Sequence, residues 1–369
     1  MKWVFSFVIV LTIFLGSTSH SYAQPAPFLL PETLKGDIVK VASQHFDDSG
    51  ELEQVSYQVT LDNGQKIVAI YQLNKLAKLE LSVGTTVVVV KTNLPNAPPS
   101  FQIVDVYRLP VLLYFLIAFA VIAILIVGKK GVGSLLGLFI SLFIILYGLV
   151  PLILKGYDPL STTIFFCLLI IVLTTYLAHG VSKKTTIALV STFISLLITL
   201  GISVLCIQVL RISGFGNENV YDLYLATNNT INAKGLLLSG IIIATLGALN
   251  DVTITQAVTL FEIKKMNKDM SFFELVKKGM SIGQEHGASM VNTIVLAYAG
   301  SSLFVFIFFI INPQKQPIWA ILNNEFIVEE IVKTLGGTMG ILLALPIVTV
   351  LAAWILTSAY FRKKNDSRV

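Results

Sequence analysis

The sequence predicts an α-helical polytopic membrane protein of about seven transmembrane helices, preceded by a small extracytoplasmic β-barrel of the OB type. Three observations predict this class. Hydrophobic residues make up 55% of the 369 residues and charged residues only 13%, whereas soluble domains carry about 25% charged residues. Apolar stretches long enough to cross a bilayer follow one another from Pro110 onward. Residues 35–108 instead carry short runs typical of β-strands.

The N-terminus resembles a secretory signal peptide over residues 1–23. Lys2 is followed by an apolar core from Trp3 to Leu15, and Ser21-Tyr22-Ala23 provides a small-x-small cleavage site before Gln24. The alternative is an uncleaved first helix. Both interpretations place the segment that follows on the outer face of the membrane.

Residues 24–108 are expected to form the extracytoplasmic β domain. Asp62-Asn63-Gly64 is a hairpin signal, and the run Val87–Val90 predicts a strand buried on both faces. The domain lacks the aromatic platform typical of nucleic-acid binding, so no nucleic acid is expected. The partner considered for this domain is an extracytoplasmic protein. The five expected strands are 36–42, 52–61, 65–73, 85–90 and 101–107.

Residues 109–369 are expected to form a seven-span membrane domain in contact with the lipid bilayer. Lysines and arginines concentrate in alternate connections, as at Lys129-Lys130, Lys183-Lys184 and Lys264-Lys265. Basic loops remain in the cytoplasm, so the sequence predicts a multi-pass cell-membrane protein with a cytoplasmic C-terminus. The expected spans are 110–128, 132–154, 160–179, 186–210, 235–260, 284–311 and 332–360.

The connection before the sixth span carries two capping signals. Ser271 and Glu274 match a capping box at the start of a short interfacial helix, which Gly279 is expected to end. Ser281 and Gln284 match a second box, expected to start the sixth span itself. The glycines around Pro346 indicate either a kinked seventh span or close helix packing.

Asp251 is the main candidate for a functional residue, because a charged side chain in the middle of a span costs roughly 2.5–3.5 kcal/mol. The sixth span adds Glu285 and His286 near its start and Asn292 deeper in the membrane. If the two spans pack as antiparallel neighbours, Asp251 lies near the level of Ser289 or Asn292. Thr255 follows Asp251 on the same helix face, and the row Gly240, Ala244 and Ala248 is expected to pack closely against another span.

Two hypotheses explain these polar residues. Asp251, Asn292, Thr255, Glu285 and His286 could form the path of a small solute or ion. Alternatively, a protonated Asp251 bonded to Asn292 could act as a structural latch in a sensor or assembly factor. An enzyme is not expected, because no His-Glu-x-x-His motif or second intramembrane aspartate accompanies Asp251. No cofactor or metal site is expected, since Cys167 and Cys206 lie within apolar segments.

Three segments of the membrane domain resemble the YibE/F-like family of bacterial multi-pass membrane proteins. They are Gly247–Val252, Gln284–Thr293 and Leu296–Gly300. The most specific part extends from His286 through Asn292-Thr293 to Gly300. The resemblance implies a membrane fold and location for most of the mature chain, and it draws attention to Asp251, His286 and Asn292 without assigning them a role.

Overall fold

The computed structural model describes residues 32–46, 52–73, 81–93, 98–311 and 315–358. The expected signal peptide, residues 1–23, lies outside these ranges. The chain divides into two compact units, one within Ala23–Ala123 and the other beginning at Ile124. Each unit is considered separately.

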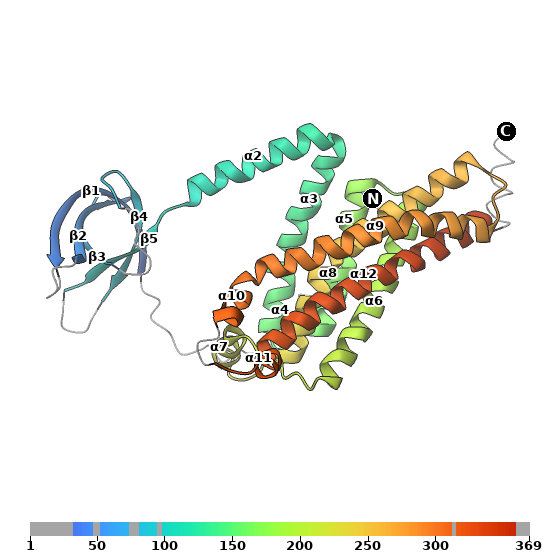
Figure 1. Cartoon of the computed structure of the whole chain (residues 1–369). Coiled ribbons are helices and arrows are strands. Elements are labelled where there is room, and N and C mark those ends of the chain that lie inside the picture. Colours follow the sequence, from blue (N-terminus) through green and yellow to red (C-terminus); the bar gives the residue numbers. More distant parts are fainter. Residues whose placement is uncertain (1–31, 47–51, 74–80, 94–97, 312–314, 359–369) are drawn as a thin grey trace. The chain divides into compact units, whose positions relative to one another are not determined.

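The first unit contains a closed five-stranded barrel (Figure 1), which confirms the expected β domain. All five expected strands are present, and the first is longer than its alternating pattern indicated. Gly64 has a φ of 81° in the hairpin turn, a conformation that glycine adopts without strain. The strands are β1 (Glu32–Phe46), β2 (Leu52–Leu61), β3 (Lys66–Gln72), β4 (Thr86–Thr92) and β5 (Ser100–Val106), in the order β1-β2-β3-β5-β4.

The barrel core consists of the inward-facing residues of all five strands. Val59, Ala69, Val87 and Val89 are each 0% exposed. In the Val87–Val90 run only alternate residues are fully buried, whereas Val88 and Val90 are half-buried on the outside. The barrel interior thus accounts for burial of one face of the strand, as expected, because one strand of a closed barrel has only one face toward the core. Burial of the other face by a partner surface stays a prediction.

Helices make up the rest of the described chain, and six of them are long and apolar enough to cross a membrane: Leu109–Val127, Lys129–Leu154, Pro159–His179, Lys183–Val209, Ala233–Met266 and Glu325–Thr357. The expected span 284–311 is helical but divides at Ser302, and its polar residues keep it out of this set. The helical elements are α2 (Leu109–Val127), α3 (Lys129–Ile144), the π-helical η1 (Ile145–Leu149), α4 (Val150–Leu154), α5 (Pro159–His179), α6 (Lys183–Val209), α7 (Glu218–Ala226), α8 (Ala233–Met266), α9 (Phe272–Ser301), α10 (Leu303–Ile311), α11 (Ile318–Leu322) and α12 (Glu325–Thr357).

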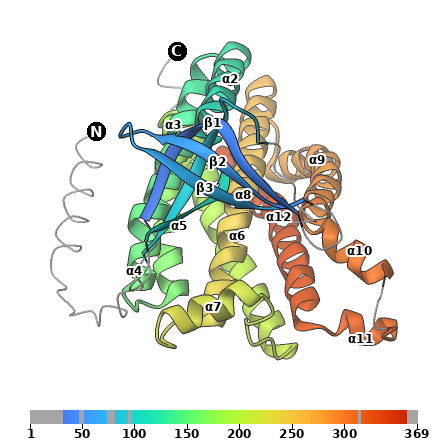
Figure 2. The same cartoon turned by 90° about the vertical axis from the view of Figure 1, so that its left-hand side faces the viewer.

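Helix α8 is the central helix of the second unit. It packs against α5, α6, α9 and α12 (Figures 1 and 2). Leu249, Val252 and Ala257 on α8 are each 0% exposed, as are Ala344 and Val348 on α12. Because α8 is surrounded in this way, most of its polar side chains have to find partners within the bundle.

Helix α9 is continuous from Phe272 to Ser301, so the expected helix end at Gly279 and the expected second capping box at Ser281 and Gln284 were wrong. The first capping box, between Ser271 and Glu274, is confirmed. Gly279 serves close packing instead of ending the helix. A Cβ atom on Gly279 would lie 2.6 Å from the Leu260 side chain, and one on Gly283 would lie 3.0 Å from Gln256.

Helix α12 starts seven residues before the expected span, at Glu325 rather than at residue 332. Asn324 caps it by accepting a hydrogen bond from the Phe326 N–H at 3.0 Å. The helix is continuous through its glycines and Pro346. A Cβ atom on Gly336 would lie 3.1 Å from Ser203 Oγ of α6. This contact favours close packing over a break as the role of the glycines.

Helices α9 and α12 run antiparallel over nearly their whole length. Gly279 faces Thr349 near one end, and Gly287 faces Leu345. Near the other end, Ser302 Oγ donates a hydrogen bond to Glu330 Oε2 at 3.3 Å. Although α9 is more polar than its neighbours, it extends beside α12 from one end of the bundle to the other.

Candidate functional site

Asp251 of α8 has two histidines near it, which come from different helices. His179, the last residue of α5, and His286 of α9 are both close enough to interact electrostatically with its carboxylate. His286 is half-buried, whereas Asp251 and His179 are exposed on the bundle surface. Two of the five expected site residues, Asp251 and His286, are thus brought together. His179 was missed because only the packing of α5 on α8 places it there.

The expected depth of Asp251 relative to the sixth span agrees with the packing of α8 and α9. Gln256 Nε2 donates a hydrogen bond to the Gly279 carbonyl at 2.8 Å. Further along the two helices, Ala248 and Ile294 line the same cavity. Asp251 lies between these contacts on α8, so it is opposite the part of α9 that contains Ser289. The two helices are antiparallel neighbours, which is the condition on which that level of Asp251 was expected.

The polar residues around Asp251 divide into two groups according to the face of α8. Thr175 Oγ1 of α5 donates to Asn250 Oδ1 at 2.8 Å, and the hydroxyls of Thr192 and Thr253 share a hydrogen bond between α6 and α8. Gln256 also donates to Thr349 Oγ1 of α12 at 2.8 Å. These inward-facing groups connect helices. Hydrogen bonds between helices satisfy polar groups that lipid cannot.

Asp251 and Thr255 occupy the other face and are both exposed. Within the described residues, no side chain donates a hydrogen bond to the Asp251 carboxylate, and no hydrogen bond joins it to Asn292. Asn292 and Glu285 are exposed on α9. The latch expected between Asp251 and Asn292 is therefore not formed in this conformation.

A cavity of about 360 Å³ lies one turn from Asp251, where α8, α9 and α12 meet. A Cβ atom on Gly240 would meet nothing within 4 Å, and Ala244 is exposed. The small-residue row of α8 thus leaves open space, and the expectation that another span packs closely against it was wrong. The cavity is lined by Ala244, Thr245, Ala248, Ile294, Ala297, Tyr298, Ser301 and Ile341.

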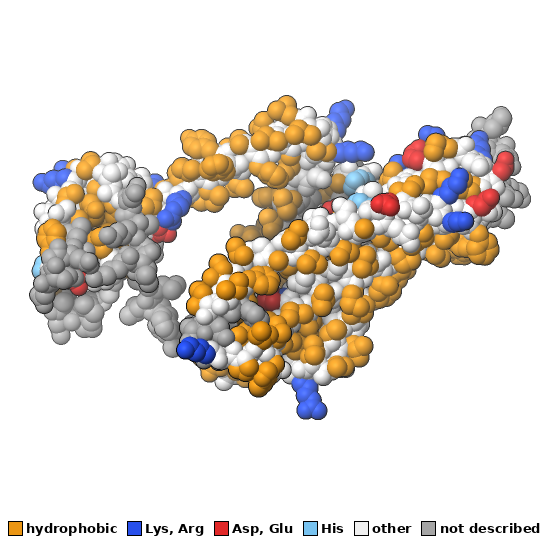
Figure 3. Space-filling view, in the orientation of Figure 1, with side chains coloured by type: hydrophobic (Ala, Val, Ile, Leu, Met, Phe, Trp, Pro, Cys, Tyr) orange, Lys and Arg blue, Asp and Glu red, His pale blue; other side chains and the backbone are white. Residues whose placement is uncertain are grey.

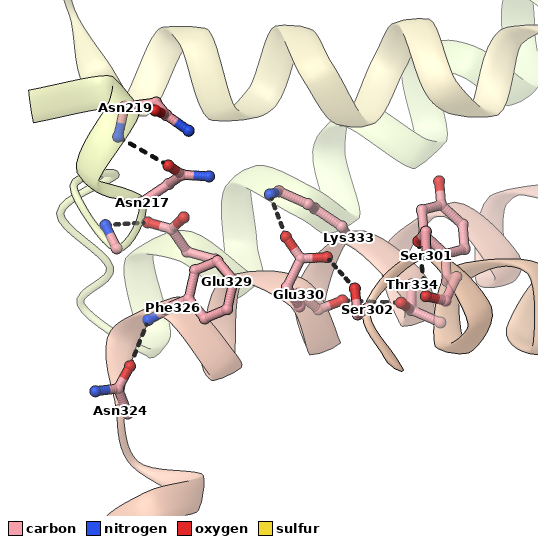
Figure 4. A network of polar contacts seen from close by, with 12 residues as sticks. Asn217, Asn219, Ser301, Ser302, Asn324, Phe326, Glu329, Glu330, Lys333 and Thr334 are labelled. Atoms are coloured by element: carbon pink, nitrogen blue, oxygen red, sulfur yellow. Dashed lines mark hydrogen bonds and ion pairs between the residues drawn. The ribbon is translucent and has the colours of Figure 1, made fainter. Parts of the chain in front are cut away.

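A second polar group, which the sequence analysis did not single out, lies at the start of α12 (Figure 4). Lys333 Nζ contacts Glu330 Oε1 at 2.7 Å, and Glu330 also accepts the hydrogen bond from Ser302. Glu329 is 2% exposed, and its Oε1 accepts a hydrogen bond from the Gly216 N–H at 3.0 Å. The sequence feature that could have drawn attention to this group is Asn324 followed by Glu325, which is a capping residue with an acidic first helical turn.

The fold and these polar groups define a polytopic helical membrane protein with an N-terminal β-barrel and ionisable residues among its helices. The chain belongs to the YibE/F-like family: the model of this family, described as YibE/F-like protein, matches residues 115–358. The match covers nearly all of the helical region, including Asp251, His286 and Glu329. A search of curated proteins gives no match.

Proposed function

We propose that the protein moves a small solute or ion across the membrane along the exposed face of α8, with Asp251 as the residue that binds a proton or cation. The observation that carries the proposal is the contrast between faces of α8. Asn250, Thr253 and Gln256 are used in bonds between helices, whereas the Asp251 carboxylate has two histidines nearby and no hydrogen-bond partner in the described chain. A structural role would leave this costly group bonded.

The polar groups follow one another along α12, α9 and α8. Glu330 and Lys333 lie at one end, and Tyr298 interacts electrostatically with Glu330 and lines the cavity of about 360 Å³. Asp251 and His286 come next. In this proposal Thr255 and Asn292 are neutral partners along the path, and Glu285 lies with His286 at its cytoplasmic mouth.

We further infer that α9 and α10 together form the seventh crossing, because α9 extends beside the apolar α12 over nearly its whole length. Seven crossings put the barrel and the C-terminus on opposite sides of the membrane, and the distribution of basic residues favours a cytoplasmic C-terminus.

Water access tests the path directly. A cysteine at Thr255 should react with a small membrane-impermeant thiol reagent in a background with Cys167 and Cys206 replaced by serine. Ile194 provides a matched control: it is 37% exposed and lies on α6 two residues beyond Thr192, which bonds to Thr253. Ile194→Cys should face lipid and stay unreacted. Equal protection of both cysteines would contradict a water-filled path at Asp251.

Asp251→Asn tests the chemistry. The substitution preserves size and removes the titratable proton, so a proton- or cation-coupled transporter should lose activity while the protein still accumulates in the membrane. Activity is measured as the ability of the variant to restore the wild-type metabolite or metal-ion profile in a deletion strain. Complementation at the wild-type level would remove this mechanism.

The second candidate function is that of a sensor or assembly factor, whose barrel binds an extracytoplasmic protein. The closed barrel favours it, since a folded domain can present a binding surface independently of the helices. In that case, residues on the barrel surface should be required for activity, whereas Asp251→Asn should be tolerated.

A further inference from the structure

A second cavity of the helical unit lies at the end where α8 and α12 begin. Its volume is about 820 Å³, within the range of sites that enclose a drug-sized molecule. Helices α7 and α11 lie at this end in both views (Figures 1 and 2). The cavity is lined by Gly216, Asn217, Glu218, Asn219, Phe304, Val305, Ile307, Ile311, Gln316, Ile321, Asn324, Phe326 and Ile327.

Most of the cavity wall is apolar, and two of its side chains are aromatic. The rings of Phe304 and Phe326 lie with centroids 6.2 Å apart. Isoleucines from α10, α11 and α12 supply most of the remaining apolar surface, and amide side chains line the rest. The faces of aromatic rings attract cations as well as apolar groups. The wall therefore suits a ligand with an apolar body.

The charged groups at this cavity are acidic. Glu218 is the one ionisable side chain among the described lining residues. Glu329 lies directly behind Gly216, since a Cβ atom on Gly216 would come within 2.8 Å of its carboxyl carbon (Figure 4). Its only hydrogen bond in the described chain is the one from that glycine.

The neighbouring carboxylates of α12 already have hydrogen-bond or ion-pair partners. Glu325 Oε1 accepts hydrogen bonds from the Ser213 hydroxyl at 2.6 Å and the Gly214 N–H at 3.0 Å. Glu330 is paired with Lys333. Glu218 thus remains as the lining carboxylate that has no hydrogen-bond partner in the described chain, and Glu329 behind Gly216 has only the N–H of that glycine.

We propose that this cavity binds a lipophilic cation, that is, a molecule with a bulky apolar body and one positive charge. The isoleucines and the two phenylalanines would enclose the body, while Glu218 supplies the attraction for the charge. This binding does not depend on transport along α8, so it can be measured whether or not that proposal holds.

Tetraphenylphosphonium and tetraphenylborate provide a matched pair of probes, because they share size and shape and differ in the sign of their charge. Full-length protein in nanodiscs should bind tetraphenylphosphonium more tightly than tetraphenylborate by about tenfold or more, since opposite charges attract at short range. Binding is measured by equilibrium dialysis as the excess over empty nanodiscs.

Two substitutions distinguish the charge from the cavity. Glu218→Gln should weaken tetraphenylphosphonium binding and leave tetraphenylborate binding unchanged. Asp222→Asn is its control, because it removes the same charge one turn further along α7 from an exposed residue outside the cavity lining. Ile307→Trp should fill the cavity and weaken the binding of both ions.

The proposal would be overturned by equal binding of the two ions, which would indicate an apolar cavity for lipid chains. It would also be overturned if Asp222→Asn weakened cation binding as much as Glu218→Gln, because the attraction would then come from overall surface charge. Thermal unfolding of each variant in nanodiscs verifies that the fold is intact.

Discussion

Consecutive residues of α8 have different roles, as Thr255 and Gln256 illustrate. Gln256 is 2% exposed, and its amide donates hydrogen bonds both to α9 and to α12. Thr255 is exposed on the opposite face. Since lipid offers no hydrogen bonds, a polar side chain buried among helices stabilises the fold only if its partners are in place.

Gln256→Leu should therefore destabilise the helical unit. We expect the free energy of unfolding to fall by about 1–1.5 kcal/mol, since hydrogen bonds between membrane helices are individually weak. Thr255→Val is the matched control and should change stability by less than about 0.5 kcal/mol. Detergent-induced unfolding measures both. A larger loss for Thr255→Val than for Gln256→Leu would contradict the assignment of the two faces.

Asp158, the N-cap of α5, should make stability depend on pH. The hydrogen bond from the Ser161 N–H lowers the pKa of Asp158 below its usual value, against a raising effect of burial, and the Ser161 hydroxyl and Asn232 lower it further. A carboxylate with a depressed pKa in the folded state stabilises the fold at neutral pH. This contribution is lost as the pH falls through the folded-state pKa.

Asp158→Asn retains a capping residue and removes the charge, so it should be less stable than the wild type at neutral pH and match it in acid. Asp158→Ala removes the cap as well and should remain destabilised, by about 1 kcal/mol, even in acid. Thermal unfolding across a pH series provides the comparison. A constant difference between wild type and Asp158→Asn at every pH would exclude the charge effect.

At the scale of helices, glycines determine how closely neighbouring elements approach. Gly279, Gly283 and Gly287 of α9 recur every four residues and face α8 and α12. On α3, a Cβ atom at Gly133 would lie 2.6 Å from the Leu177 carbonyl oxygen of α5. Small residues in such rows allow helix backbones to approach within van der Waals contact in a membrane.

Gly133→Ala should push α3 away from α5, because the obstructing atom belongs to the backbone and cannot rotate aside. The expected loss is about 1–3 kcal/mol of stability, as for overpacked cores. Gly201→Ala is the control, since a Cβ atom there would meet nothing within 4 Å. It should stabilise α6 by about 0.5–1 kcal/mol. Thermal unfolding in detergent should show opposite signs, and equal losses would contradict the contact.

At the scale of the whole molecule, folding brings basic residues from two different connections together at one end of the helical unit. Lys130 and Lys184 both interact electrostatically with His179, although they belong to different helices. In the space-filling view hydrophobic side chains cover much of the helical surface, and lysines and arginines lie toward its ends (Figure 3). This is the charge distribution of a helical bundle that crosses a bilayer.

Reporter fusions test the orientation that follows from these charges. Fusions after Lys130, Lys184, Lys268 and Lys363 should be active as cytoplasmic reporters. Fusions near Asn96, Asp158, Asn217 and Gln316 should be external. A cytoplasmic result near Gln316 together with an external result after Lys363 would show that α9 and α10 do not cross, which would leave six spans and remove the seven-span topology.

The barrel should fold without the helices. A fragment of residues 24–108 contains all five strands, and β5 pairs with both β3 and β4 to close the barrel. Its circular dichroism spectrum should be that of a β protein, with cooperative thermal unfolding. A fragment ending at residue 99 lacks β5 and should not unfold cooperatively. A disordered or helical spectrum for the longer fragment would contradict an independent domain.

The sequence alone was sufficient for the strands, for most of the spans and for Asp251 as a candidate site. Each of these rests on local properties: alternation along a strand, the length of an apolar run, or one charge within such a run. The same local reasoning was wrong at Gly279, because a glycine that ends a helix and a glycine that lets two helices approach have the same sequence signature.

Only the tertiary structure decided what surrounds Asp251. His179 lies far from it in sequence and is brought near by the packing of α5 on α8. The row at Gly240 and Ala244 was left open, while the glycines of α9 took the close contacts. Which of two similar helix faces becomes buried depends on the fit of all neighbouring helices at once, and no single segment of sequence contains that information.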